Sequence, residues 1–444
     1  MPAAGAIRAT ILVVVLLTFH VAKATAKERN LAHIFNSWKQ QPQDTDSGPN
    51  PEWKSSQHLT WFVADNVPEK YYAPASRPRQ FGYQALGPQI DYQREQWASS
   101  WPDVDGWVLN QLRQSPLNVM AEADADIVII PVVLRVGKPA DPNDPHTAVQ
   151  GDFVSNVASF LPGVFKKPHL VILNHGMQVY HPAFLDHRSS NLTFLSISPS
   201  IGPINGKAHP IPHVVGMPYF LRTHWNQYST LTHQLPIANA SLEANKSHFA
   251  STSFSIRDWP DRFVLHRHCL NNKQLCTFHN YAGDMKDSLA LDDLMSASWH
   301  VIHPMGDFFN RGAWFDSVLA CAIPVVFKEH YADYLPFTDV LDYSRIMTVL
   351  PEALLEENAT VNAIDVAFDR FNKHAALGQL QYIHEVRHIF QYSLNPAHDL
   401  LRWDQRGHRD PRDDAFTFTM KAVMRNVCGR QQHLLPLQCL VGSS

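Results

Sequence analysis

Two continuous apolar runs mark the first half of the chain. They are Ile-Val-Ile-Ile-Pro-Val-Val at 127–133 and Leu-Val-Ile-Leu at 170–173. Runs of β-branched residues of this length are typical of strands that are covered on both faces, as in a parallel sheet. A helix-like segment at 152–161 lies between them. The order strand, helix, strand predicts an α/β domain.

A second set of elements begins near Phe249. It has an apolar run at 299–303, a polar loop, a helix and another apolar run at 323–327. Within 312–322, Phe315, Val318, Leu319 and Ala322 fall at i, i+3, i+4 and i+7. This spacing predicts a helix that packs on a sheet and leaves Asp316 off the packed face. Further helical patterns lie at 361–371, 375–391 and 413–427.

The N-terminus predicts entry into the secretory route. Arg8 precedes an apolar run at 9–19, and small residues occupy 24–26, a pattern typical of an export signal. The run is shorter than the roughly 20 residues that span a bilayer, so cleavage after Ala26 and a short uncleaved signal anchor both remain open. The polar segment that follows, to about residue 57, is predicted to be a stem or linker.

Length and charge narrow the function classes. A chain of 444 residues predicts two domains of about 150 to 200 residues each. Lys and Arg number 37 against 41 Asp and Glu, a formal net charge of -4. This balance argues against a nucleic-acid partner and against membrane binding through charge alone.

Sequons and cysteines also indicate a lumenal protein. Four Asn-x-Ser/Thr sequons are candidate glycosylation sites, at Asn191, Asn239, Asn245 and Asn358. The chain has five cysteines, an odd number. In an oxidising compartment the local pairs are Cys269 with Cys276 and Cys428 with Cys439. Cys321 lies in an apolar stretch and is expected to be a buried free thiol.

The loop at 303–311 is the strongest candidate for a ligand site. It lies between an apolar strand and a helix, and ligands of open α/β sheets bind at the carboxyl ends of strands. Gly306 lets backbone approach a diphosphate, the helix N-terminus offers N–H groups, and Arg311 adds a fixed positive charge. Asp316 is placed to accept hydrogen bonds from ribose. The pattern alone fits equally well a common turn before a helix.

The same region resembles a known enzyme family. The segment 294–352 contains MGDFFNRGAWFDSVLACAIPVVF and LPFTDVLDYSRIMTVLPE. It resembles the nucleotide-binding half of the exostosin family of glycosyltransferases, and within it the plant branch that includes xyloglucan galactosyltransferases. The resemblance extends over about residues 105–430, strongly in the second half and weakly in the first.

The resemblance implies a fold and an activity. Similar proteins are α/β and of the GT-B type, with two Rossmann-like domains facing a cleft, and they invert the transferred sugar without a bound metal. The implied domains are a signal peptide or short anchor at 1–26, a stem at 27–58, an N-terminal acceptor domain at 59–235 and a C-terminal nucleotide-sugar domain with terminal helices at 236–444.

Site residues follow from the matching positions. The resemblance implies that Gly306, Asp307, Arg311 and Asp316 hold a UDP-sugar, with Arg262 as a second candidate near the diphosphate. No cofactor or metal is expected. The expected partners are the nucleotide sugar, a polysaccharide or glycan acceptor, the Golgi membrane if the signal is uncleaved, and other glycosyltransferases in a complex. The expected location is the lumenal face of the Golgi.

Inversion also requires a base for the acceptor hydroxyl. The first domain offers His169, His175 and Asp186, the last matching an aspartate of the family's Asp-x-Arg segment. A histidine after a strand is more often a packed residue, so the sequence leaves the base unassigned.

Several positions depart from the family pattern. Cys321-Ala322 stands for Gly-Cys before the Ile-Pro-Val strand, and Gly312 follows Arg311 where a second arginine is usual. A Phe-Ala-Gly turn appears as 249–251, followed by Phe254 where an arginine is usual. In the first domain Lys167-Pro168-His169 replaces Gly-Arg-Asp-His, and Ser198 replaces an acid.

Two other readings compete with a transferase. The segment 384–388, His-Glu-Val-Arg-His, has the H-E-x-x-H pattern of zinc proteases, although the Gly and His of the longer metzincin form are missing. The departures at Ser251 and Phe254 also allow a catalytically silent, glycan-binding partner that keeps the fold.

Overall fold

The computed structural model of the chain describes about half of its residues. These are 60–64, 67–68, 89–91, 96–98, 108, 112–113, 115, 117–134, 152–153, 156–157, 159, 167–173, 192–197, 199–204, 207–211, 213–219, 223–225, 239–254, 259–280, 285–304, 311–391 and 415–430. The expected signal, the stem, Asn191, His175, Asp186, Gly306, Asp307, Ser198 and Cys439 lie outside them.

The first half forms a five-stranded parallel sheet in the order β1-β4-β5-β6-β9. The apolar runs found in the sequence are its central strands, and the register pairs Ile129 with Leu170. The helical pattern between them is borne out at 152–153, 156–157 and 159. The strands are β1 (Trp61–Val63), β4 (Ile127–Leu134), β5 (His169–Leu173), β6 (Leu192–Ser196) and β9 (Val214–Gly216).

The second half forms another five-stranded parallel sheet, in the order β12-β11-β13-β14-β15. Its strands are β11 (His248–Ser253), β12 (Cys276–His279), β13 (Ser298–Ile302), β14 (Ile323–Val326) and β15 (Thr348–Val349). Two parallel sheets in one chain confirm the α/β class and the pair of Rossmann-like modules that the GT-B type requires.

Two small antiparallel sheets complete the described strands. One has the order β10-β3-β2, and the other pairs β7 with β8. Their strands are β2 (Gln89–Asp91), β3 (Gln96–Ala98), β7 (Ser200–Ile204), β8 (Lys207–Pro210) and β10 (Thr223–Trp225).

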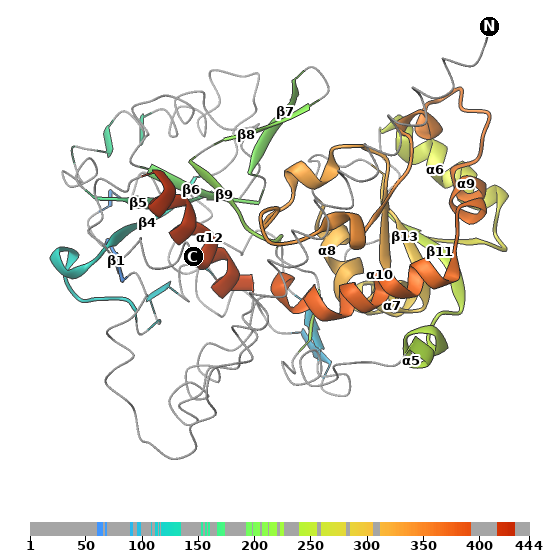
Figure 1. The fold of residues 1–444 in the computed structure, drawn as a ribbon, viewed down its shortest axis with the longest axis horizontal. Coiled ribbons are helices and arrows are strands. Elements are labelled where there is room, and N and C mark those ends of the chain that lie inside the picture. Colours follow the sequence, from blue (N-terminus) through green and yellow to red (C-terminus); the bar gives the residue numbers. More distant parts are fainter. Residues whose placement is uncertain are drawn as a thin grey trace, which may run out of the picture. The chain divides into compact units, whose positions relative to one another are not determined.

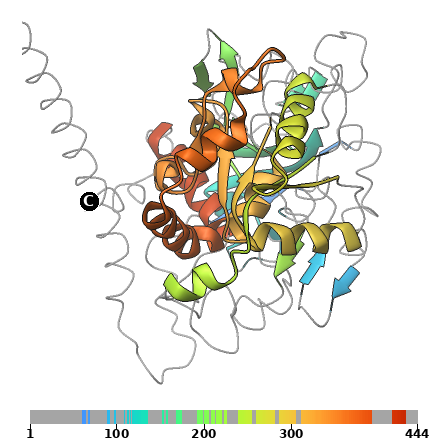
Figure 2. The ribbon, with the colours of Figure 1, turned by 90° about the vertical axis from the view of Figure 1, so that its right-hand side faces the viewer.

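Helices surround the second sheet in both views (Figure 1, Figure 2). Asn362 and Asn372 begin two of them with side chains that accept backbone N–H groups, as N-caps do. The α-helices are α5 (Asn239–Ala244), α6 (Pro260–Asn271), α7 (Met285–Ser296), α8 (Gly312–Leu319), α9 (Ala363–Asp369), α10 (Lys373–Val386) and α12 (Ala415–Arg430). The 3-10 helices are η5 (Glu122–Asp124), η10 (Tyr331–Tyr334), η11 (Tyr343–Arg345), η12 (Glu352–Leu355) and η13 (Arg387–Phe390).

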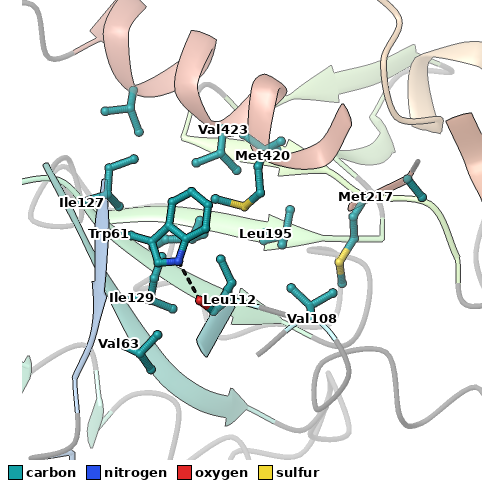
Figure 3. Packing of buried hydrophobic residues seen from close by; sticks show 14 of the residues in the cluster. Trp61, Val63, Val108, Leu112, Ile127, Ile129, Leu195, Met217, Met420 and Val423 are labelled. Atoms are coloured by element: carbon teal, nitrogen blue, oxygen red, sulfur yellow. Dashed lines mark hydrogen bonds between the residues drawn. The ribbon is translucent and has the colours of Figure 1, made fainter. Parts of the chain in front are cut away.

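The last helix returns to the first sheet. In Figure 3, Met420 and Val423 of α12 lie over Trp61 and Ile127, inside one apolar cluster. The Trp61 indole N–H donates to the Leu112 carbonyl at 2.8 Å, so its polar atom is satisfied within this core. The sequence-based boundary at residue 236 grouped the terminal helices with the second sheet, whereas α12 packs in the core of the first.

A disulfide joins Cys269 and Cys276, the local pair expected from the sequence. It connects the end of α6 to the start of β12. Cys321 is a buried free cysteine, as expected. Cys428 is disulfide-bonded, and its expected partner, Cys439, lies outside the described residues. None of the helices among the described residues is long and apolar enough to cross a membrane.

Candidate active site

The carboxyl ends of three neighbouring strands bring the main site candidates to one edge of the second sheet. β11, β13 and β14 lie side by side and parallel, and each is followed by a segment with a cation. These cations are Arg262 after β11, Arg311 after β13 and Lys328 after β14. The Thr252 hydroxyl donates to the Ile302 carbonyl at 2.7 Å, which ties the ends of β11 and β13 together. This edge is where ligands of open parallel sheets bind.

Arg311 is held at the start of α8. Its backbone is extended, with φ -125° and ψ 142°, and it occupies the N-cap position. One guanidinium nitrogen, Nη1, donates to the Pro304 carbonyl at 2.8 Å. This bond joins the two ends of the loop between β13 and α8. A helix N-terminus carries partial positive charge, so Arg311 adds a full charge where an anion is already favoured.

A buried chain of hydrogen bonds connects the end of β13 to α8. His303 Nε2 lies 3.2 Å from the Ser317 hydroxyl, which donates to the Trp314 carbonyl at 2.7 Å. His303 directly follows β13, and its backbone N–H donates to Val325 of β14 at 2.8 Å. This chain fixes the orientation of α8 relative to the strand before it.

Asp316 is more enclosed than the sequence suggested. The apolar spacing placed it off the packed face, but only 7 % of its surface is exposed. The reason is that α8 packs against α7, α10 and β14 together, so all its residues from 313 to 319 are buried. In this conformation the Asp316 side chain offers little surface to a ribose.

Two tyrosines that sequence reasoning missed lie at the start of α8. An added Cβ on Gly312 would come within 3.2 Å of the Tyr219 ring. Tyr219 follows β9, so the carboxyl end of the first sheet meets the α8 N-terminus there. The buried hydroxyl of Tyr331, in η10 after β14, feels both the charge and the backbone of Arg311. Tyr219 is 93 positions from Gly312 and Tyr331 is 20 positions from Arg311, and no local motif marks either tyrosine.

Arg262 is buried in the first turn of α6. Its guanidinium carbon lies 5.8 Å from the centre of the Trp259 ring, within the range of a cation–π contact. Arg262 is therefore held at the start of its own helix, which follows β11 in the chain.

His169 lies in the first sheet, at the amino end of its strand, away from the carboxyl edge where ligands of parallel sheets bind. It is the first residue of β5, at the amino end of a strand between β4 and β6, and its exposed fraction is 0 %. Nδ1 lies 2.8 Å from the Lys167 carbonyl. Burial lowers the pKa of His169 to about 4, only partly opposed by that hydrogen bond. The side chain is therefore a packed, neutral histidine. The other two base candidates, His175 and Asp186, lie outside the described residues.

The structure gives no support to the zinc-protease reading. α10 ends at Val386 and continues as the 3-10 helix η13, which breaks the regular helical turn between His384 and His388. Both histidines are buried, whereas Glu385 is exposed. Within the part of the chain that the structure describes, no three His, Cys, Asp or Glu side chains gather as a metal site would require.

Residues that depart from the family pattern are packed or hydrogen-bonded in the structure. Phe254 is buried in the core of the second sheet, and its ring stacks edge-on with Phe278 at 5.2 Å. Residues 249–251, expected as a turn, lie inside β11. Lys167 donates to three carbonyls in η5 and directly after it, those of Glu122, Ala123 and Ala125, at 2.7, 3.0 and 2.8 Å. Lys167 is therefore engaged in holding η5 against β5.

Comparison with known proteins decides the family. Residues 71–364, more than half of the chain, match the exostosin GT47 domain. The chain belongs to the exostosin GT47 family. This membership places the GT47 chain among glycosyltransferases and confirms the resemblance seen in its sequence.

One curated relative is the "Probable xyloglucan galactosyltransferase GT15" of Arabidopsis thaliana. It is 30% identical over 157 residues, which are 33% of the GT47 chain and 30% of the relative. The match thus spans less than a third of that protein's length, so the relative's activity does not transfer directly.

Solved structures of sugar-handling enzymes are also similar. WaaG, a glycosyltransferase of lipopolysaccharide biosynthesis, is 9% identical with a TM-score of 0.28, over 82% of the GT47 chain and 98% of its own. Sucrose-phosphate synthase from Thermosynechococcus elongatus is 10% identical with a TM-score of 0.27, over 63% and 88%. The fold class rests on the two parallel sheets rather than on these low scores.

Proposed function

We propose that this GT47 protein is an inverting, metal-independent glycosyltransferase. It moves galactose, arabinose or a related sugar from a UDP-sugar to a polysaccharide or glycan in the Golgi lumen. The observation that carries the proposal is Arg311, fixed at the N-terminus of α8 on the carboxyl edge of the second sheet. A fixed cation at a helix N-terminus is suited to a diphosphate.

The transfer forms one bond and breaks one. The acceptor hydroxyl oxygen attacks the anomeric carbon, the bond from that carbon to the diphosphate oxygen breaks, and the hydroxyl proton passes to a base. Negative charge builds on the departing UDP, where Arg311 and the helix N-terminus stabilise it. Arg262, at the same edge, is a second group for this charge. The base is not assigned among the described residues.

The proposed Golgi location is supported by the N-terminal sequence and by two glycosylation sequons that are exposed in the structure. The N-terminal pattern predicts export, and the sequons at Asn245 and Asn358 are exposed in the structure. Complexes with other glycosyltransferases and a membrane anchor are part of the same proposal and rest on the family resemblance.

A panel of UDP-sugars tests the activity. The lumenal protein is incubated with each donor, with and without glycan acceptors, and UDP release is measured. We expect one donor to release UDP and a chelator to leave the rate unchanged. UDP release from no donor under any acceptor would contradict the proposal.

Removing Arg311 tests the site. We expect Arg311→Ala to lower the turnover rate about a hundredfold or more, because the lost contact strengthens as the leaving group gains charge. Thermal unfolding should change little, since Arg311 is only partly buried and lies at the end of a helix rather than in the core. Arg370→Ala, which removes an exposed arginine at the end of α9, is the matched control and should keep full turnover. Full turnover in Arg311→Ala with normal melting would place the diphosphate elsewhere.

A catalytically silent partner is the second candidate function. Phe254 favours it, because a buried apolar ring occupies a position where the similar family carries an arginine. Such a protein would neither hydrolyse nor transfer from any UDP-sugar, so the donor panel separates the two functions.

A further inference from the structure

The segment after β14, residues 328–336, lies against the carboxyl edges of both parallel sheets. β14 pairs with β13, and the His303 N–H, which donates to the Val325 carbonyl at 2.8 Å, continues this pairing past the end of β13. The 3-10 helix η10 contacts both strands of the β7–β8 hairpin, which follows β6 of the first sheet. Pro336 lies at the end of β9, where an added Cβ on Gly216 would come within 3.0 Å of its Cα. The segment therefore runs through the region where ligands of both sheets would bind.

A histidine and a carboxylate stand together on this segment. His330 is the N-cap of η10, and its Nδ1 lies 3.6 Å from Oδ2 of Asp333. The Asp333 backbone N–H also donates to the His330 carbonyl at 3.1 Å, which keeps both residues in one turn. The side-chain atoms are slightly farther apart than in a hydrogen bond, and catalytic hydrogen bonds are often long before a substrate binds. An imidazole held through Nδ1 keeps Nε2 for a proton from another molecule.

Both side chains are open to solvent. The exposed fractions are 42 % for His330 and 49 % for Asp333. His303, which follows β13, is instead buried, and its Nε2 lies 3.2 Å from the Ser317 hydroxyl. His169 is buried at the amino end of its strand in the first sheet. Of these three histidines, His330 is the one that an acceptor hydroxyl can reach.

We infer that His330 is the base that accepts the proton of the acceptor hydroxyl, and that Asp333 is its positioning residue. The inference rests on the proposed function and supplies the base that this function requires. The acceptor oxygen forms its bond to the anomeric carbon, the bond from that carbon to the diphosphate oxygen breaks, and the proton passes to His330 Nε2. The bonding electrons leave with the diphosphate. The imidazolium lies beside the Asp333 carboxylate, which favours its charged form, and later gives its proton to water.

Removing the imidazole tests the base. We expect His330→Ala to lower the turnover rate about a hundredfold or more, the usual contribution of a general base. The melting temperature, and the affinity for UDP measured by calorimetry, should hardly change, because the side chain is half-exposed and acts on the acceptor rather than on the nucleotide. His374→Ala, at an exposed position of α10, is the matched control and should keep full turnover. Full turnover in His330→Ala would overturn the inference.

Added imidazole separates a base from a merely structural side chain. A free imidazole can enter the space that His330→Ala leaves at a half-exposed position and accept the same proton. We expect it to restore part of the turnover of His330→Ala and to leave Arg311→Ala unchanged, because Arg311 acts through its charge on the diphosphate. Low turnover in His330→Ala that imidazole does not raise would overturn the assignment of His330 as the base.

A double-mutant cycle tests whether Asp333 acts through His330. Asp333→Asn should lower turnover about tenfold with the donor KM little changed, because the imidazole loses the carboxylate that orients it. Asp333→Glu, which restores the carboxylate, should recover most of this loss. In the His330→Ala background, Asp333→Asn should cost almost nothing further. An equal loss in both backgrounds would show that Asp333 does not position His330.

The failure of the proposed function gives a different result. Wild-type protein that releases UDP from no donor, with any acceptor, would remove both the function and its base. Wild-type transfer that persists in His330→Ala would keep the function and place the base on another residue.

Discussion

At the residue scale, two glycines permit close contacts near the candidate site. An added Cβ on Gly216, at the end of β9, would lie 3.0 Å from the Pro336 Cα and 3.1 Å from the Pro199 ring. On Gly312 it would lie 3.2 Å from the edge of the Tyr219 ring. The first neighbours are backbone and a rigid ring, whereas the second is a side chain that can rotate.

This difference predicts unequal effects of adding one methyl group. Gly216→Ala should lower the free energy of unfolding by about 1–3 kcal/mol, because Pro336 and Pro199 cannot move without a backbone shift. Gly312→Ala should change it by less than about 1 kcal/mol, since the Tyr219 ring can yield and alanine favours the helix. Urea unfolding of both variants gives the comparison. Equal losses would mean that the space around Tyr219 is as rigid as that around Pro336.

The sequence could identify only part of the site at this scale. Arg311 was found because it precedes a helix with clear apolar spacing and follows a buried strand. Tyr219 and Tyr331 were not, because their role depends on where β9 and β14 end in space. Asp316 was misplaced for a related reason, since apolar spacing reports one packed face and α8 is covered on several.

At the element scale, each parallel sheet holds a buried neutral histidine within its strands. His169 lies in β5 and His300 in β13, and burial lowers the pKa of each to about 4. A hydrogen bond to backbone opposes the shift in both cases, to Lys167 and to Phe249 respectively. Both rings are buried, with 0 % of His169 and 6 % of His300 exposed, so neither can be protonated without losing its packing.

These two histidines predict a loss of stability in acid. The unfolded chain protonates them near pH 6.5, but the folded chain does so only near pH 4. The unfolded state therefore binds more protons between these values, and stability falls as pH drops through this window, with no further loss from them below it. Between pH 7 and 5 we expect a loss of about 2 kcal/mol for each histidine.

Urea unfolding at several pH values measures this effect. His169→Gln should reduce the pH dependence, because one of the histidines whose pKa burial lowers is gone. His374→Gln, at an exposed position of α10, is the control and should leave the slope unchanged. If His169→Gln keeps the full slope, other groups cause the acid sensitivity.

Four strands of the two sheets were predictable, β4, β5, β13 and β14, because they are continuous apolar runs. The predicted strand at 299–303 is β13 (Ser298–Ile302), and that at 323–327 is β14 (Ile323–Val326). The predicted helix at 413–427 is α12 (Ala415–Arg430). Periodicity gives the type of an element and which residues are apolar, but it does not say which sheet an apolar face will cover.

At the scale of the whole molecule, α12 shows this limit. It follows the second sheet in sequence, yet its apolar face joins the core of the first (Figure 3). Its N-terminus also contacts the end of the preceding region, through Ala415 N–H to the Gln391 carbonyl at 2.9 Å. The exposed pair Arg425–Asp339, at 2.9 Å, adds another contact between α12 and residues after β14.

This packing predicts that a change near the C-terminus destabilises the first sheet. Val423 is fully buried among Trp61, Ile127 and their neighbours, so Val423→Ala should cost about 1–3 kcal/mol through lost burial and a small cavity. Arg425→Ala, two positions away on the same helix, removes only an exposed ion pair and should cost less than about 1 kcal/mol.

Hydrogen exchange then shows where protection is lost. In Val423→Ala we expect β4, β6 and β9 to exchange faster while β13 and β14 keep their protection, because the cavity opens beneath the first sheet. Faster exchange confined to β13 and β14 would instead show that α12 belongs energetically to the second sheet, as the order of the sequence alone suggested.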